Sequence, residues 1–184
     1  MENVNINGIG NIDTVKELFK SVKCLEDDNI FLVLLNRDYV PTSIENNTFY
    51  KNNAVNQAVA GMFDEFNSKL NDKQKIAFSR NVYTGFLINV VNDGIGVIPL
   101  VNSGQLIPNI KDFITDIDHY IFFNNDEIEK IEITKLPLRF STRMLKISFK
   151  GLDGAKTPWT LPMKHKLVSY QEENYNKLAQ KISK

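Results

Sequence analysis

Two carboxylates and an imidazole stand within four residues of one another, as Asp116, Asp118 and His119. Carboxylates beside a histidine are groups that general acid–base catalysis and metal binding both use. The chain has only two histidines, and no second His or Cys cluster accompanies this motif. We therefore expect no catalytic residue and no metal here, and interpret the motif as the polar entrance to a strand. The alternative is a small hydrolase or transferase with its site at these three residues.

Other residues that could take part in catalysis or ligand binding lack the partners that such chemistry needs. Gly8 and Gly10 resemble the start of a phosphate-binding turn, but Asp13 occupies the third glycine position and would repel a phosphate. Cys24 has no evident histidine partner, and Ser103 lacks the Gly-x-Ser-x-Gly frame of a nucleophile. We expect no cofactor and a protein that is not an enzyme.

Charge is unevenly distributed along a chain whose formal net charge is zero. Residues 81–134 hold two basic and eight acidic residues, whereas residues 135–184 hold eleven basic and three acidic ones. The basic third predicts a surface for anionic head groups, phosphates or an acidic partner. The anion- or partner-binding candidates are Lys156, Lys164, His165 and Lys166, because no acid lies between Gly154 and Tyr170.

Compensation between neighbouring strands is the alternative explanation of this charge pattern. If a hairpin turns at residues 137–142, Glu132 lies opposite Lys146. The same register places Ile131 opposite Ile147 and Ile133 opposite Leu145. Core pairs and one opposite-charge pair then align together, as cross-strand pairing favours.

Composition restricts the class of protein. A hydrophobic fraction of 42% supports a real core, and the single cysteine suits a reducing compartment. The polar residues after Met1 do not form a signal peptide, and no apolar run is long enough for a transmembrane segment. We expect a cytoplasmic protein, and neither the net charge nor any Arg–aromatic motif predicts nucleic-acid binding.

The first half of the chain predicts helices and one strand. Thr14 and Glu17 form a capping-box pair in residues 14–23, whose apolar side chains recur at helical spacing. The apolar run 30–35 predicts a buried strand. Residues 54–80 predict a helical insert with one strongly apolar face.

The second half changes to strand periodicity. Residues 82–91 and 96–101 flank Asn92-Asp93-Gly94 and predict a hairpin, and residues 110–117 favour a short helix or an irregular segment. Four strands are predicted between Asp118 and Leu161, namely 119–123, 128–135, 143–150 and 155–161. We expect the first two of these to form a second hairpin.

A helix is predicted for residues 168–182. It opens on a capping-box pair, Ser169 and Glu172, and carries an apolar face. That face consists of Val168, Tyr175, Leu178 and Ile182. The fold class is α+β: about seven antiparallel strands in a partly open barrel, closed by this C-terminal helix.

Residues 95–182 resemble the bacterial pleckstrin-homology-like and GRAM-like domains. The stretches that carry the resemblance are Tyr120-Ile-Phe-Phe, Asp126-Glu-Ile-Glu-Lys-Ile-Glu-Ile, Leu145-Lys-Ile-Ser-Phe-Lys and the helix in 170–182. The resemblance implies a seven-stranded barrel with a C-terminal helix that binds lipids or proteins. Its usual phosphoinositide-binding cations lie in the first hairpin, where this chain supplies only Arg37.

These expectations combine into one domain, residues 1–184. Residues 1–27 form an N-terminal helical segment, and residues 28–184 form the barrel with its insert and C-terminal helix. We expect a non-enzymatic binding or scaffold module that recognises a protein partner or an anionic ligand, and an anionic-lipid module is a further alternative. Self-association is also expected, through any part of the insert's face at Met62, Phe63 and Phe66 that is exposed.

Overall fold

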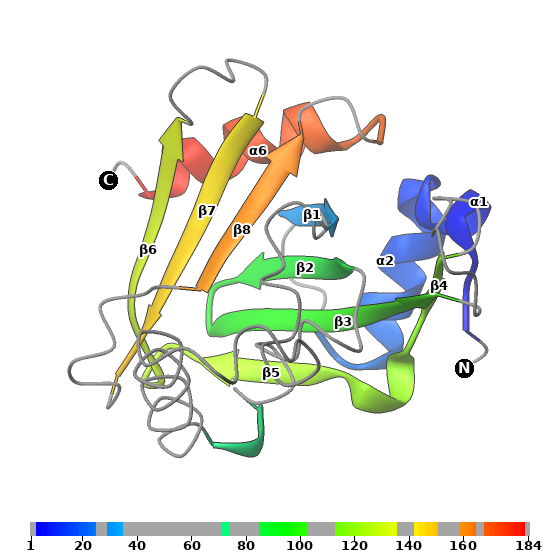
Figure 1. Ribbon diagram of the computed structural model, residues 1–184, viewed down its shortest axis with the longest axis horizontal. Helices are drawn as coiled ribbons and strands as arrows, with labels where there is room; N and C mark the ends of the chain where they lie inside the picture. Colours follow the sequence, from blue (N-terminus) through cyan, green and yellow to red (C-terminus); the bar gives the residue numbers. More distant parts are fainter. Residues whose placement is uncertain are drawn as a thin grey trace, which may run out of the picture.

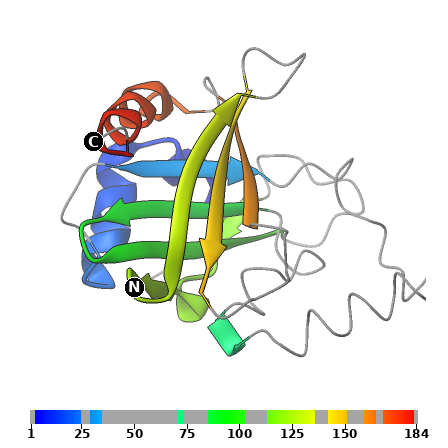
Figure 2. The same cartoon turned by 90° about the vertical axis from the view of Figure 1, so that its left-hand side faces the viewer.

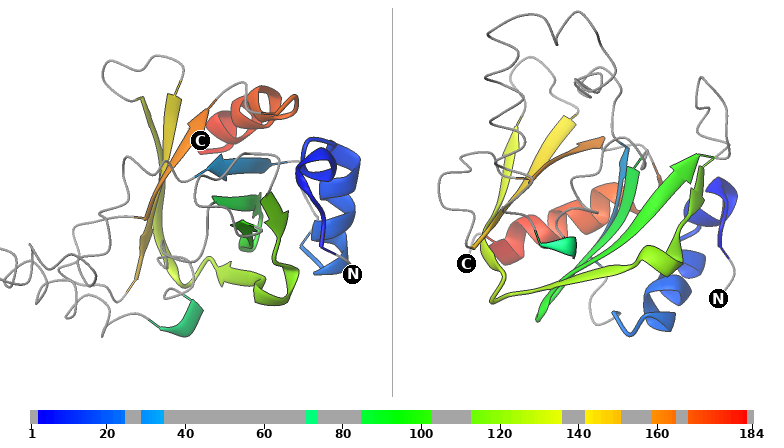
Figure 3. Two further views of the ribbon diagram at one scale, coloured as in Figure 1. Left: turned by 45° about the vertical axis from the view of Figure 1, so that its right-hand side comes forward. Right: turned by 60° about the horizontal axis from the view of Figure 1, so that its bottom comes forward.

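A computed structural model describes residues 3–24, 29–34, 71–73, 85–102, 113–135, 142–150, 159–164 and 168–182. These residues form an α+β structure in which two antiparallel sheets curl into a half-barrel (Figure 1). One sheet lies between the other sheet and a pair of N-terminal helices (Figure 3). The expected fold class is confirmed at this level.

The larger sheet has five strands. They are β1 (Ile30–Leu34), β2 (Gly85–Val91), β3 (Gly94–Asn102), β4 (Phe113–Thr115) and β5 (Ile121–Asn124). The predicted hairpin of β2 and β3 is confirmed, because Val91 pairs with Gly94 across Asn92 and Asp93. β4 and β5 pair with the two halves of β3 along one edge. Residues 113–115 are thus a strand, and the expected helix or irregular segment there is wrong.

The smaller sheet has three strands, β6 (Ile128–Lys135), β7 (Thr142–Phe149) and β8 (Trp159–Lys164), in that order. The register of β6 and β7 pairs Glu132 with Lys146 and Ile133 with Leu145. The register predicted from the sequence is therefore confirmed, and Glu129 is accommodated in an irregularity between Ile128 and Lys130. This sheet crosses the larger one steeply (Figure 2).

The expected second hairpin is wrong. β5 pairs with β3, whereas β6 pairs with β7, so the turn after Asn124 carries the chain from one sheet into the other. A turn between two alternating segments fixes a change of direction but does not by itself fix which strands pair. His119 does not begin a strand either, since residues Ile117–His119 form the 3-10 helix η4.

Both faces of the larger sheet are buried, so β2 has no exposed residue. One face packs on the smaller sheet and the C-terminal helix through Phe31, Val33, Phe86, Ile88, Val97, Phe123, Leu145, Ile147 and Leu178. The other face packs on the N-terminal helices through Leu18, Phe19, Ile30, Leu32, Leu87, Ile98 and Leu100. A strand that is buried on both faces carries a continuous run of apolar residues, which explains the pattern of residues 30–34.

The N-terminal helices are α1 (Ile6–Ile9) and α2 (Ile12–Ser21). The predicted helix is confirmed, but the expected capping pair of Thr14 and Glu17 is wrong. Asn11 is the cap, since its side-chain oxygen accepts the Asp13 N–H at 2.9 Å. After α2, Lys23 adopts a left-handed conformation with φ of 57°, and the Cys24 N–H bonds to the Phe19 carbonyl at 2.8 Å.

The C-terminal helix is α6 (Gln171–Ile182), in the corner between the two sheets (Figure 3). Its buried stripe differs from the predicted apolar face: Leu178 is buried, but Ile182 is 37% exposed. Gln171 and Asn174 are the other buried residues of the helix. Beside α6, β1 and β8 lie in contact, yet no ladder joins them among the described strands.

Some predictions concern residues outside the described ranges. The helical insert 54–80 is among them except for residues 71–73, and so are Met62, Phe63 and Phe66. No helix in the part of the chain that the structure describes is long and apolar enough to cross a membrane.

Candidate functional site

The strand β6 presents the candidate binding edge. Within the described residues it pairs with β7 on one side only. Ile131 and Ile133 are half-buried and pack against the core between the sheets, as does Tyr175 of α6. An edge strand with half-exposed apolar side chains offers both main-chain hydrogen-bonding groups and side-chain contacts to an added strand.

The outward face of β6 is polar and its charges are paired. The Lys130 Nζ lies 2.8 Å from the Glu132 Oε1, and Lys146 lies opposite Glu132 on β7. The hydrogen bond from Lys130, against a smaller opposing effect of desolvation, holds the pKa of Glu132 below its ordinary value. Cross-strand compensation thus accounts for part of the charge pattern in the sequence, as the second explanation predicted.

The four predicted anion-binding residues are not placed. Lys156, His165 and Lys166 lie outside the described residues, and of Lys164 only the main chain is described, where it pairs with Thr142. Their use as an anion-binding surface stays a prediction.

Asp116 and His119 do meet in the structure. Asp116 precedes η4, and its Oδ2 lies 2.8 Å from the His119 Nδ1. This hydrogen bond and the charge of Asp116 raise the pKa of His119, with a smaller contribution from Asp118. Because the imidazole is 56% exposed, the pair is a surface ion pair rather than a closed site.

The pair does not belong to a larger group of possible metal ligands in the described ranges. No group of three or more His, Cys, Asp or Glu residues that could hold a metal occurs there. A carboxylate that orients an imidazole is one part of several hydrolase sites, but a nucleophile within reach of the free ring nitrogen is needed as well. Asp116 and His119 thus form a polar surface pair in and beside η4, just before β5 begins at Ile121.

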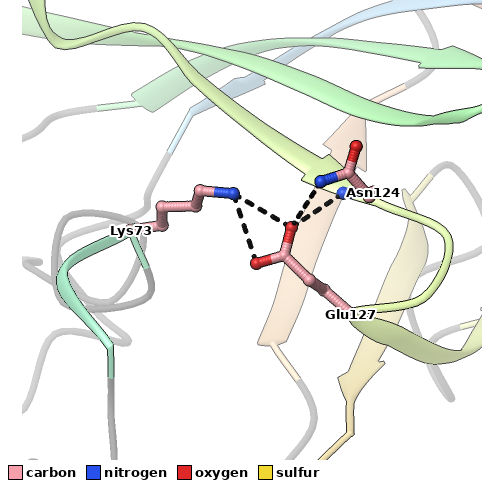
Figure 4. Close-up of polar contacts among 3 residues, drawn as sticks. All are labelled: Lys73, Asn124 and Glu127. Carbon is pink, nitrogen blue, oxygen red and sulfur yellow. Dashed lines mark hydrogen bonds and ion pairs between the residues drawn. The ribbon is translucent and has the colours of Figure 1, made fainter.

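The turn that joins the two sheets forms a second polar cluster (Figure 4). The Lys73 Nζ donates to the Glu127 Oε2 at 3.0 Å, and the same oxygen accepts the Asn124 N–H at 2.9 Å. Burial raises the pKa of Glu127, but these hydrogen bonds outweigh it and the net pKa is lowered. The cluster fastens residue 73 to the junction of the sheets.

Further hydrogen bonds tie the same end of the molecule together. The Asn125 side chain donates to the Asn92 carbonyl at 2.6 Å, and the Lys181 Nζ donates to the Asn92 Oδ1 at 2.8 Å. Asn92 thus links the β2–β3 turn both to the β5–β6 turn and to the end of α6. These contacts are structural, because they satisfy turn groups that would otherwise need water.

The single cysteine is buried under α2. Tyr120 hydrogen-bonds to the Cys24 side chain, and burial together with this bond raises the pKa of the Tyr120 phenol. The Asn89 amide donates to the Cys24 carbonyl at 2.8 Å, while its Oδ1 has no hydrogen-bond partner among the described residues. Gly96 lies against the Cys24 sulfur, so the cluster is tightly packed.

Sequence reasoning missed two side chains that hold α6 against β1, Gln171 and Asn174. Both are buried and both bond to the main chain of β1. The available signal was their spacing, because positions 171, 174 and 178 lie on one helical stripe and two of them carry amides.

Comparisons with known proteins give no relationship. No family model matches this chain, and neither a curated protein nor a solved structure is similar to it at the level that would indicate relatedness. Function therefore has to be argued from the geometry above.

Proposed function

We propose that this chain is a non-enzymatic binding or scaffold module of pleckstrin-homology-like architecture, and that β6 takes up an extended segment of a protein partner. The single observation that carries the proposal is β6 itself, paired on one side within the described residues and bordered by half-buried Ile131 and Ile133. Strand addition needs these two features, since main-chain hydrogen bonds supply affinity and alternate side chains supply specificity.

The order of the elements supports the proposed architecture. Strands β1, β2, β3 and β5 follow one another as antiparallel neighbours, and β6, β7 and β8 do the same in the second sheet. These seven strands are followed by α6, and the resemblance implies seven strands and a C-terminal helix. The short strand β4 is an addition to it.

We choose a protein partner over an anionic ligand because β6 pairs on one side only within the described residues. On the described part of the smaller sheet, Lys130 and Lys146 both lie beside Glu132, so one carboxylate offsets only part of the positive charge of the two lysines. An extended peptide can use the edge without such charge.

A displayed library of twelve-residue peptides, selected against the full chain, tests this function. We expect enriched sequences with alternating apolar residues, whose binding shifts the amide NMR signals of β6. Ile131→Lys should abolish their binding. The matched control is Val101→Lys, which alters a half-buried side chain packed on the same core but on β3, where it pairs with Ile114 of β4.

Two outcomes would count against the proposal. One is equal loss of binding in both variants, which would indicate general destabilisation. The other is a set of shifted signals centred away from β6. An anionic-lipid surface is distinguished by co-sedimentation with phosphatidylserine vesicles but not with phosphatidylcholine vesicles, abolished by Lys164→Glu with Lys166→Glu.

A second candidate function rests on the Asp116–His119 hydrogen bond at 2.8 Å. It is a hydrolase or transferase in which Asp116 orients the imidazole and His119 acts as the base. His119→Gln decides between the two: it would abolish such an activity, whereas peptide binding at β6 should be unchanged.

A further inference from the structure

The outer edge of β1 has a definite set of hydrogen-bonding groups. The Val90 N–H bonds to the Asn29 carbonyl at 3.1 Å, which makes these two residues a hydrogen-bonded pair of the β1–β2 ladder. Because such pairs alternate along antiparallel strands, Phe31 directs its main-chain groups towards β2. Ile30 and Leu32 therefore direct theirs away from β2, towards α6.

Side-chain amides of α6 occupy these positions. The Gln171 Oε1 accepts the Leu32 N–H at 2.9 Å, and the Gln171 Nε2 donates to the Leu32 carbonyl at 2.9 Å. The Asn174 Nδ2 donates to the Ile30 carbonyl at 3.0 Å. One glutamine amide thus reproduces both hydrogen bonds that a neighbouring strand would make with Leu32.

The attachment of α6 combines buried polar side chains with the apolar contacts of Leu178 and half-buried Tyr175. Gln171 is 1% exposed and Asn174 is 4% exposed, and Leu178 is the one fully buried apolar side chain within α6. Neutral hydrogen bonds contribute little net stability because water replaces them on opening. An element with a single fully buried apolar side chain is a candidate for opening before global unfolding.

We propose that α6 is a latch: it stands in for a missing strand at the edge of β1, and it opens as a unit while the two sheets stay folded. Opening exposes the Leu32 N–H and carbonyl and the Ile30 carbonyl on an edge that lies beside β8. The device is independent of the peptide-binding function proposed for β6, since it rests on other residues.

Amide hydrogen exchange measured by NMR tests the latch directly, because Leu32 and Phe31 are adjacent residues with different partners. Among the described residues, Gln171 is the acceptor for the Leu32 N–H, whereas the N–H of Phe31 faces β2. We expect the Leu32 amide to exchange at least tenfold faster than the Phe31 amide, with the same opening constant as the Leu178 amide inside α6.

Variants at Gln171 sharpen this test. Gln171→Ala should raise the exchange rate of Leu32 and Leu178 at least tenfold and leave that of Phe31 unchanged. Gln180→Ala is the matched control, the same substitution at an exposed position of the helix, and should change none of them. Equal rates for Leu32 and Phe31 in the unaltered protein, or equal acceleration of both by Gln171→Ala, would overturn the proposal.

A pH-dependent variant covers the case in which Gln171→Ala fails to fold. In Gln171→Glu, a protonated carboxyl group accepts the Leu32 N–H and donates to its carbonyl as the amide does, whereas the carboxylate repels that carbonyl. We expect Leu32 protection close to that of the unaltered protein below the pKa of the introduced group, and its loss above it. Protection independent of pH in this variant, at a rate corrected for intrinsic exchange, would contradict the latch.

Discussion

Replacing Gly96 with alanine should destabilise the protein through one identifiable overlap. A Cβ at this position would overlap the Cys24 sulfur, and it would lie 3.2 Å from the Tyr120 hydroxyl. Cys24 is only 2% exposed, so the sulfur has little room to move. Overpacking of this kind costs about 1–3 kcal/mol, and about 2 kcal/mol lowers the Tm of a chain of this size by roughly 4–8 °C.

A double-mutant cycle isolates the overlap. Cys24→Ala alone removes the sulfur and its hydrogen bond with Tyr120, which costs about 1–2 kcal/mol. In the presence of that change Gly96→Ala should cost much less, because the remaining neighbours, the Tyr120 hydroxyl and the Cβ of residue 24, lie at 3.2 and 3.3 Å. We expect the two changes together to be at least ~1 kcal/mol less destabilising than the sum of the single changes.

Urea and thermal unfolding followed by circular dichroism measure each corner of the cycle. Gly94→Ala is the control, since its Cβ would overlap the main-chain oxygen of Phe123, which no side-chain truncation removes. Its effect should add to that of Cys24→Ala within about 0.5 kcal/mol. Additivity of the Gly96→Ala and Cys24→Ala effects within the same margin would refute the packing argument for this cluster.

Three further predictions concern titration and backbone strain. NMR titration should give His119 a pKa above its ordinary value, and Asp116→Asn should remove the increase. Because the folded pKa is raised, the pair stabilises the protein below pH ~6.5, and that stability is lost as pH rises through the folded pKa. The pKa of Glu127 is shifted in the opposite direction, downward, so the stability it contributes is present above pH ~4.3 and is lost as pH falls through the folded pKa. Glu127→Gln should therefore reduce the fall of the unfolding free energy at acid pH. Lys23→Gly should raise the unfolding free energy by about 1 kcal/mol, because its φ of 57° disfavours a side chain; an unchanged or lower Tm would contradict this.

Local sequence patterns predicted a strand and its register well where one face of the strand is buried, or where the charge pattern and the apolar pattern favour the same register. The β6–β7 register followed from the sequence because the pairing of Glu132 with Lys146 and of the isoleucines selects the same alignment. The start of α2 was less well predicted, since Asn11 and Thr14 are both good capping residues and only backbone geometry chooses between them.

The candidate binding edge on β6 could be predicted only in part from the sequence. Alternation identified β6 as a strand, but whether a strand lies at an edge depends on the pairing of the whole sheet. The Asp116–His119 contact was anticipated as a juxtaposition of residue types, and the 3-10 turn supplied its geometry.

Local sequence patterns were sufficient to predict the α+β class, the positions of most described strands, the register of β6 on β7 and the helix at the C-terminal end. These properties depend on the side-chain period and on turn residues, which are local. Tertiary structure alone decided that β5 pairs with β3 rather than with β6, and that Gln171 and Asn174 replace a strand at the edge of β1. Both features depend on which main-chain groups remain unpaired once the two sheets have packed together, and a local pattern of side chains does not predict this.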